Sequence, residues 1–405
     1  MKTTPAKGLT IIIAMMSMIG PFTIDTYLPS FPAIEAEFGI SRALLSQSLA
    51  FYLAAFAIST LVLGPLSDRL GRRQVMLGTL LFYIAASFGC AMATDYSSFL
   101  MFRLLQGAAA GGGLVAGRAM IRDIYSPQDA QKAMSRVMIL FGLAPAVAPI
   151  IGGWLHDAFG WHSVFYFLVL YSALVFVLVS IHLPETLATN LRQSFHPVNV
   201  ARVYGRTLVH RRFQSLVFMV ACYFGGMFLY IAAAPTVIFD FMKLESSDFA
   251  ILFIPMVAGM ISGAWLSGQL AHHWPRERTL TLALTLMALG TILNSAQALF
   301  LAPMAISIIV PLMIYTCGIG IAMPAMMVMS MDCFPNNRGT ASAVMGFVQM
   351  LGNALIASLA VPLLSQQPSH LALGQTALIA IALVLWWRIP AQLEKPHSET
   401  IKANT

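Results

Sequence analysis

The chain has 405 residues, of which 58% are hydrophobic and only 10% are charged, and its formal net charge is +7. A soluble domain typically carries about 25% charged residues, so this composition argues against a molecule whose whole surface faces water. The basic residues stand at the ends of apolar segments and not in runs interleaved with aromatic residues, which argues against a nucleic-acid-binding protein. Most of the surface is therefore expected to face lipid.

Twelve apolar segments, each near the roughly 20 residues that cross a bilayer core, follow one another along the chain. The predicted spans are Leu9–Leu28, Leu44–Leu66, Val75–Ala93, Ser98–Ala119, Ala133–Leu155, Val164–Leu183, Leu216–Phe239, Phe249–Ala271, Leu280–Phe300, Met304–Met329, Ala341–Leu364 and Leu371–Ile389. The sequence thus predicts an all-α membrane protein with 12 transmembrane helices.

The distribution of Lys and Arg predicts the orientation of these helices. With the N-terminus inside, only Arg42 and Lys243 fall in outer loops and Arg103 lies within a span, so 23 − 3 = 20 basic residues lie on the inner side. The positive-inside rule then places both termini in the cytoplasm. No small-residue cleavage site follows the basic start of the chain, so we expect a first span there and not a signal peptide.

The two halves of the chain repeat short patterns at an offset near 205 residues. The segment 64–72 aligns with 268–276, 25–29 with 231–235, and 122–127 with 331–335. Three matches in order and near one offset indicate two six-helix halves, an arrangement in which transporters bind substrate between the halves. The expected domains are an N-terminal half at 1–183, a cytoplasmic linker at 184–214 and a C-terminal half at 215–405 with a short tail.

Metal and enzyme chemistry find little support in the sequence. Cys90, Cys222, Cys317 and Cys333 lie far apart without metal-ligand or disulfide spacing, so we expect no metal site. No His/Asp/Ser cluster indicates an enzyme, and no Walker A pattern indicates ATP as the energy source. We expect no cofactor.

Three motifs carry a family resemblance. Gly64-Pro-Leu-Ser-Asp68-Arg-Leu-Gly71-Arg72-Arg resembles the signature loop of the major facilitator superfamily, and Arg103-Leu-Leu-Gln106-Gly resembles the RxxQG motif of its drug/proton antiporters. The segment 144–153, with Pro149, Gly152 and Gly153, resembles the antiporter motif of span five, although alanine replaces two glycines.

Further segments resemble the Bcr/CflA subfamily of bicyclomycin and chloramphenicol exporters. They are 25–29, 122–125, 226–228 and 234–235. The resemblance implies the major facilitator fold and a proton-coupled antiporter that exports a drug or a metabolite from a bacterial cytoplasm through the inner membrane. It also implies small organic molecules, protons and lipid as partners, and we expect a monomer. Proton-driven uptake of a small nutrient is the alternative.

Asp25 is the acid that stands out, because a charge within a span is costly unless it faces a cavity or a partner. With a rise of 1.5 Å per residue, Asp25 lies about 24 Å along span one, and Arg103 lies about 8 Å below the outer surface. We predict that Asp25 carries the transported proton and that Arg103, with Gln106 on the same helix face, tunes it. The alternatives are a fixed Asp25–Arg103 ion pair that only joins two helices, and an Arg103 that only packs.

The resemblance implies a role for each of the other two motifs. Gly64, Asp68, Gly71, Arg72 and Asp123 would form a conformational latch, in which Asp68 meets the N-terminal end of span eleven. Pro149, Gly152 and Gly153 would seal the protein against leak. The alternative for Pro149 is an ordinary kink.

The wall of the substrate cavity is predicted more loosely, from aromatic, Met and amide side chains that suit a permissive pocket. Besides Asp25, Arg103 and Gln106, the candidates are Tyr27, Tyr52, Phe141, Tyr223, Met227, Tyr230, Phe253, Met256, Tyr315, Phe347, Gln349 and Asn353. The alternative for each is packing or contact with lipid.

Overall fold

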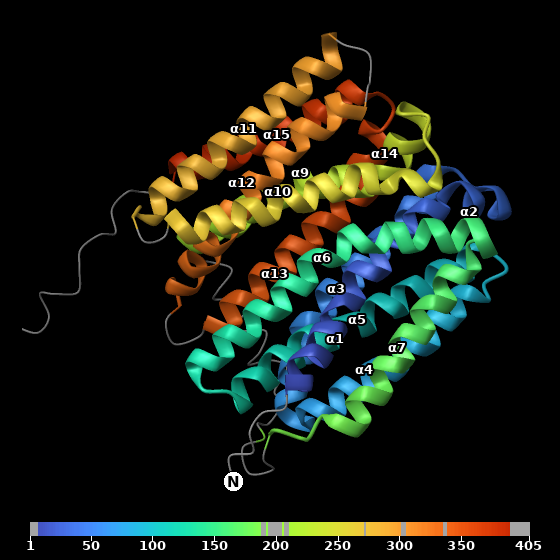
Figure 1. The fold of residues 1–405 in the computed structure, drawn as a ribbon, viewed down its shortest axis with the longest axis vertical. Coiled ribbons are helices and arrows are strands. Elements are labelled where there is room, and N and C mark those ends of the chain that lie inside the picture. Colours follow the sequence, from blue (N-terminus) through green and yellow to red (C-terminus); the bar gives the residue numbers. More distant parts are fainter. Residues whose placement is uncertain are drawn as a thin grey trace, which may run out of the picture.

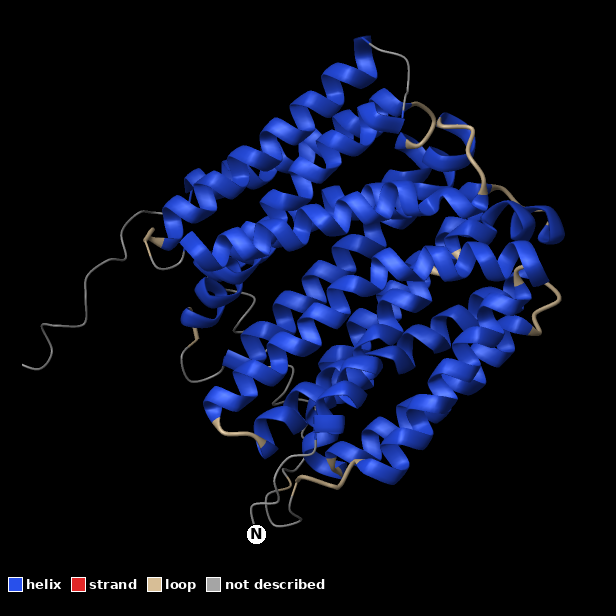
Figure 2. Cartoon of the chain, viewed as in Figure 1, coloured by secondary structure: helices blue, strands red, loops and turns tan. Residues whose placement is uncertain are grey.

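The computed structural model describes residues 7–187, 192, 205, 210–270, 273–300, 305–334 and 338–388. These residues form helices and their connections, and no strand occurs among them (Figures 1 and 2). In the part of the chain that the structure describes, twelve helices are long and apolar enough to cross a membrane, and they confirm the predicted spans. Most of the predicted linker, the chain before Lys7 and the tail after Arg388 lie outside the described residues, so the domain boundaries stay a prediction.

The N-terminal half contains the first six spans. Its helices are α1 (Lys7–Asp25), α2 (Phe31–Phe38), α3 (Arg42–Leu70), α4 (Arg72–Ala91), α5 (Tyr96–Ile124), α6 (Pro127–Phe159) and α7 (His162–His182). Within this half, α5 packs against α3 and α4, while α1 packs against α5, α6 and α7.

The C-terminal half contains the other six spans. Its helices are α9 (Arg211–Ala232), α10 (Phe249–Leu270), α11 (Arg276–Phe300), α12 (Ala305–Asp332), α13 (Arg338–Leu355), α14 (Val361–Leu364) and α15 (Pro368–Arg388). Here α12 packs against α10 and α11, and α9 packs against α13 and α15.

The first span differs from the prediction because it is broken. α1 ends at Asp25, a short 3-10 turn at Leu28–Ser30 follows, and α2 continues to Gly39, whose φ of 63° ends that helix. The sequence predicts Asp25 inside a continuous span, whereas the structure places it at the end of α1, at the break. Pro29 follows this break, and a proline cannot donate the backbone hydrogen bond that a continuous helix needs.

Two spans also contain π-helical turns that the sequence did not predict. Thr236–Phe241 extends the span of α9, and Ile356–Ala360 lies between α13 and α14. Such wide turns are rare and are often found at functional sites.

The two halves meet along two pairs of helices, α3 with α13 and α6 with α10. We call the end of the bundle where α3 begins the Arg42 end, and the opposite end, where α4 begins, the Arg72 end. At the Arg42 end, the Arg42 guanidinium binds the Asp240 carboxylate across the halves, and the Gln47 amide donates to the Ser358 carbonyl oxygen at 2.9 Å. From this end α6 and α10 diverge (Figure 1).

At the Arg72 end, two ion pairs among the described residues each join residues of the same half. Arg72 binds Asp123 in the N-terminal half, and Arg276 binds Asp332 in the C-terminal half. The halves are thus tied together by polar contacts at the Arg42 end.

Glycines allow the closest helix crossings in the C-terminal half. A Cβ atom at Gly263 of α10 would collide with the backbone of Cys317 on α12, and one at Gly320 of α12 would collide with Met260 of α10. Small residues of this kind let membrane helices approach closely enough for their backbones to touch.

The Gly263→Ala substitution should therefore force α10 and α12 apart, at a cost of about 1–3 kcal/mol for an overpacked contact. We expect a lower melting temperature of the purified protein in detergent. Gly268→Ala is the matched control, because no atom lies within 4 Å of its added methyl group. Equal melting temperatures for the two variants would contradict this packing.

Candidate functional site

Arg103 of α5 is the centre of a buried polar cluster in the N-terminal half. Its side chain has no exposed surface. The guanidinium Nη1 donates to Gln106 Oε1 at 2.6 Å and to the Thr23 carbonyl oxygen of α1 at 3.4 Å. Nε and Nη2 have no hydrogen-bond partner. The arginine therefore keeps unused donors in the interior of the bundle, where an unpaired charge is costly.

Two tyrosine rings compensate part of this cost. The Arg103 guanidinium lies 4.3 Å from the ring centroid of Tyr27 and 4.7 Å from that of Tyr52. Contact of a guanidinium with the face of an aromatic ring stabilises the charge by about 2 kcal/mol or more when the pair is desolvated. Tyr27 and Tyr52, predicted as cavity residues, thus lie against Arg103, and neither has exposed surface in this conformation.

Gln106 extends the cluster to α4. Its amide nitrogen donates to Ser87 Oγ at 2.8 Å and lies 3.5 Å from Tyr83 Oη. Tyr83 Oη and Thr23 Oγ1 share a hydrogen bond of 2.5 Å, which closes the cluster back onto α1. Sequence reasoning missed Tyr83, Ser87 and Thr23, since polar residues that occur singly in apolar spans give no motif.

Asp25 is buried beside this cluster without an ion pair. Its side chain is 3% exposed, and Oδ1 has no hydrogen-bond partner. No ion pair or hydrogen bond joins Asp25 to Arg103, although both residues are described. The alternative of a fixed Asp25–Arg103 ion pair is therefore wrong for this conformation. A buried carboxyl group without a cation is less costly when it holds a proton than when it is charged.

Glycines bring the neighbouring helices onto this region. A Cβ atom at Gly107 would collide with the backbone of Tyr52, and one at Gly152 of α6 would collide with the backbone of Thr26, next to Asp25. The adjacent Gly153 lies against the backbone of Ser246 in the C-terminal half. The glycines of the span-five motif thus place α6 between the helix break at Asp25 and the other half.

The other predicted cavity residues, all of them in the C-terminal half except Phe141, fall into two groups. Tyr223, Tyr230, Phe253, Met256, Tyr315 and Asn353 are buried, whereas Phe141 of α6 and Met227, Phe347 and Gln349 are partly exposed. The Tyr315 hydroxyl donates to the Tyr223 carbonyl oxygen at 2.6 Å, so this tyrosine is already satisfied inside its own half. Asn353 Oδ1 is buried without a partner.

A second polar cluster in the C-terminal half was missed by sequence reasoning, apart from Tyr230. The Asn294 amide donates to Tyr230 Oη at 2.6 Å and to Gln375 Oε1 at 3.1 Å, and Gln375 donates to the Gly226 carbonyl oxygen at 3.2 Å. This cluster joins α9, α11 and α15 through neutral groups. Among the described residues, the buried charged side chains, Asp25, Arg72 and Arg103, lie in the N-terminal half.

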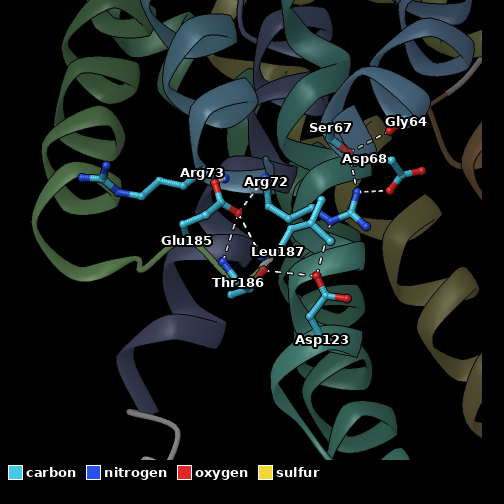
Figure 3. A network of polar contacts seen from close by, with 9 residues as sticks. All are labelled: Gly64, Ser67, Asp68, Arg72, Arg73, Asp123, Glu185, Thr186 and Leu187. Atoms are coloured by element: carbon cyan, nitrogen blue, oxygen red, sulfur yellow. Dashed lines mark hydrogen bonds and ion pairs between the residues drawn. The ribbon is translucent and has the colours of Figure 1, made fainter. Parts of the chain in front are cut away.

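The signature loop forms a separate network at the Arg72 end (Figure 3). The Arg72 guanidinium donates to Ser67 Oγ at 2.7 Å and to Asp123 Oδ2 at 3.3 Å, and it also binds the Asp68 carboxylate. Gly71 has φ of 114°, a conformation that side chains rarely adopt. The side chains at the start of α13, which the predicted latch would contact, lie outside the described residues.

Glu185 completes this network and was also missed. Its carboxylate accepts hydrogen bonds from the backbone N–H groups of Arg72 at 2.9 Å and Arg73 at 3.2 Å (Figure 3). It therefore caps the N-terminus of α4, where the helix dipole favours an anion. Thr186 donates to Asp123 Oδ2 at 3.1 Å, so the chain after α7 is fixed to the loop. No sequence signal connects Glu185 to a loop 113 residues earlier.

No metal centre appears in this region. Among the described residues, no group of three or more His, Cys, Asp or Glu side chains could hold a metal ion.

Among the described residues, twelve apolar helices with buried charges in the N-terminal half define a polytopic membrane protein. The model of the Major Facilitator Superfamily matches residues 10–357, so the chain belongs to this superfamily. The fold agrees: a D-xylose-proton symporter matches with a TM-score of 0.73 and 16% identity, over 94% of this chain and 97% of that one.

Two curated relatives match over most of both chains. A transporter of Bacillus subtilis described as "Uncharacterized MFS-type transporter YdgK" is 29% identical over 87% of this chain and 88% of its own length. A "Bicyclomycin resistance protein homolog" of Haemophilus influenzae is 26% identical over 93% of this chain and 94% of its own length. The resemblance to the Bcr/CflA subfamily is thereby confirmed.

The Gln106→Leu substitution tests the cluster. It removes the nearest acceptor of Arg103 and a donor to Ser87. The free energy of unfolding should therefore fall by about 1–3 kcal/mol, and the protein should melt at a lower temperature in detergent. Gln297→Leu is the control, because Gln297 Oε1 is buried without a partner and its removal should be neutral or stabilising. A Gln106→Leu protein as stable as the Gln297→Leu protein would contradict the cluster's role.

Proposed function

We propose that the protein is a proton-coupled antiporter that exports small organic molecules, such as bicyclomycin- or chloramphenicol-type drugs or a metabolite. The observation that carries the proposal is Asp25, a buried carboxyl group without an ion pair at a break in the first span. A group in that position can bind and release a proton without breaking an ion pair. The relative with a bicyclomycin-resistance name supports export as the direction.

We further propose that the Arg72 end faces the cytoplasm. The distribution of basic residues supports this orientation. In that orientation, the inter-half polar contacts of the described residues Arg42 and Gln47 lie on the outer side, and we propose that the structure represents an inward-facing conformation. A cytoplasmic substrate would reach the region of Asp25 between the diverging ends of α6 and α10, and a proton on Asp25 would leave toward the cytoplasm.

Arg103 supports this cycle without pairing with the acid. Held by Gln106 and by the rings of Tyr27 and Tyr52, the guanidinium also contacts α1 at the Thr23 carbonyl oxygen, two residues before Asp25. We propose that its unused Nε and Nη2 groups donate hydrogen bonds to the Asp25 carboxylate once the proton has left. The new ion pair between Asp25 and Arg103 would pull the break after α1 toward α5. Proton release would in this way cause a movement of the helix.

The Asp25→Asn variant tests the proton role in proteoliposomes. A pH difference of one unit supplies about 1.36 kcal/mol per proton, enough for roughly a tenfold concentration ratio of a neutral drug. We expect the wild-type protein to build such a ratio with bicyclomycin or chloramphenicol, and the variant to allow only gradient-independent exchange. Asp157→Asn, a change of an exposed carboxyl group, is the control.

A folded Asp25→Asn protein that still concentrates the drug as the Asp157→Asn control does would contradict the proton role. The sign of movement separates export from the alternative of symport. An inward proton gradient should drive the drug outward; inward accumulation would establish uptake instead.

The signature-loop network is proposed to act as the latch of the cycle. In this structure Asp68 binds Arg72 within its own half. We propose that in the opposite conformation Asp68 contacts the start of α13. Asp68→Asn should slow transport at saturating drug by about tenfold or more and leave the binding affinity of the inward-facing state within about twofold. Drug binding in detergent and transport in vesicles give the two values; a large loss of affinity would contradict the latch.

A further inference from the structure

The contact between the halves at the Arg42 end includes one charged group shared by three elements. The Arg42 guanidinium donates from Nε to Glu35 Oε1 at 2.8 Å and from Nη2 to Glu35 Oε2 at 3.3 Å. From Nη1 it binds the Asp240 carboxylate and lies 3.4 Å from Thr236 Oγ1. One edge of the guanidinium is therefore held within the N-terminal half, while its other end reaches across to the C-terminal half.

The bidentate contact with Glu35 orients Arg42 for this reach. A planar guanidinium bound through two nitrogens by one carboxylate has its remaining N–H groups fixed in direction. Glu35 stands on α2, the short helix beyond the break at Asp25, and its side chain is 17% exposed. The position of α2 thus determines where the free end of Arg42 points.

On the other side, Asp240 lies on the π-helical turn Thr236–Phe241 that follows the span of α9. Its side chain is 49% exposed, so water reaches this end of the pair. A cavity of about 280 Å³ opens beside it and is lined from both halves, with Ser46 and Ala232 among the lining residues. The ion pair therefore crosses a water-accessible cleft between the halves.

We propose that Arg42 is the gating residue of the Arg42 end, with Glu35 positioning it and Asp240 as the carboxylate that it releases when this end opens. Opening must separate α3 from the Thr236–Phe241 turn, because these elements carry the two partners in different halves. The Glu35 contact stays intact in the process, since both of its residues move with the N-terminal half. This gate depends only on alternate opening of the two ends, whichever ion or substrate the protein carries.

The test measures opening through a cysteine placed at Ser46, a cavity-lining residue that is 2% exposed in the closed form. The full-length protein in vesicles is treated with a membrane-impermeant maleimide, and the labelling of the parent protein with its native cysteines is subtracted. Because an exposed ion pair shifts a two-state equilibrium by up to about fivefold, Asp240→Asn and Arg42→Gln should each raise the labelling rate about three- to fivefold.

Glu35→Gln is the matched control. It removes a carboxylate from the same guanidinium but leaves the contact between the halves, so the labelling rate should rise less than twofold. An equal rise in Glu35→Gln and Asp240→Asn would overturn the proposal. So would an unchanged rate in Asp240→Asn.

Ionic strength gives a second measurement that requires no change of the gate residues. Salt screens exposed charges, since the Debye length falls from about 30 Å at 0.01 M to about 3 Å at 1 M. The labelling rate of the Ser46→Cys protein should rise with salt over this range, and that of its Asp240→Asn derivative should not. A rate independent of salt in both would overturn the gate and leave the proton role of Asp25 untouched.

Discussion

Burial of the Arg103 charge is the constraint on which the polar interior of the N-terminal half depends. A guanidinium without exposed surface must find acceptors or aromatic faces nearby, and here Gln106, the Thr23 carbonyl and two tyrosine rings provide them. The requirement accounts for polar groups on four helices, α1, α3, α4 and α5. It also leaves Asp25 free of an ion pair, because the arginine is stabilised without it.

The span-five glycines connect this interior to the boundary between the halves. Gly152 lies on the backbone of Thr26 and Gly153 on that of Ser246, so α6 has a backbone contact on each side. Because closely packed interiors are hardly compressible and transmit strain, a movement of the helix break at Asp25 would displace α6. Protonation and opening would be coupled through this contact.

The sequence predicted the parts of the structure that depend on composition and on local motifs. Twelve spans followed from apolar length, and the loop at Gly64–Arg73 and the pair Arg103 and Gln106 were singled out by their resemblance to motifs of the superfamily. The break after Asp25 was missed because the apolar run continues through Leu28 and Pro29, and hydropathy does not distinguish a broken span from a continuous one. The contacts that Glu185, Asn294 and Gln375 make with other helices join residues 64 or more positions apart, and periodicity in one segment carries no information about them.

Proton release on substrate binding shows whether Asp25 exchanges a proton for substrate. Purified protein in weakly buffered detergent solution is mixed with bicyclomycin or chloramphenicol while a pH indicator follows the solution. We expect release of up to one proton per bound drug molecule in the wild-type protein and none in Asp25→Asn. Equal release by both proteins, or drug binding to the wild-type protein without any release, would contradict it.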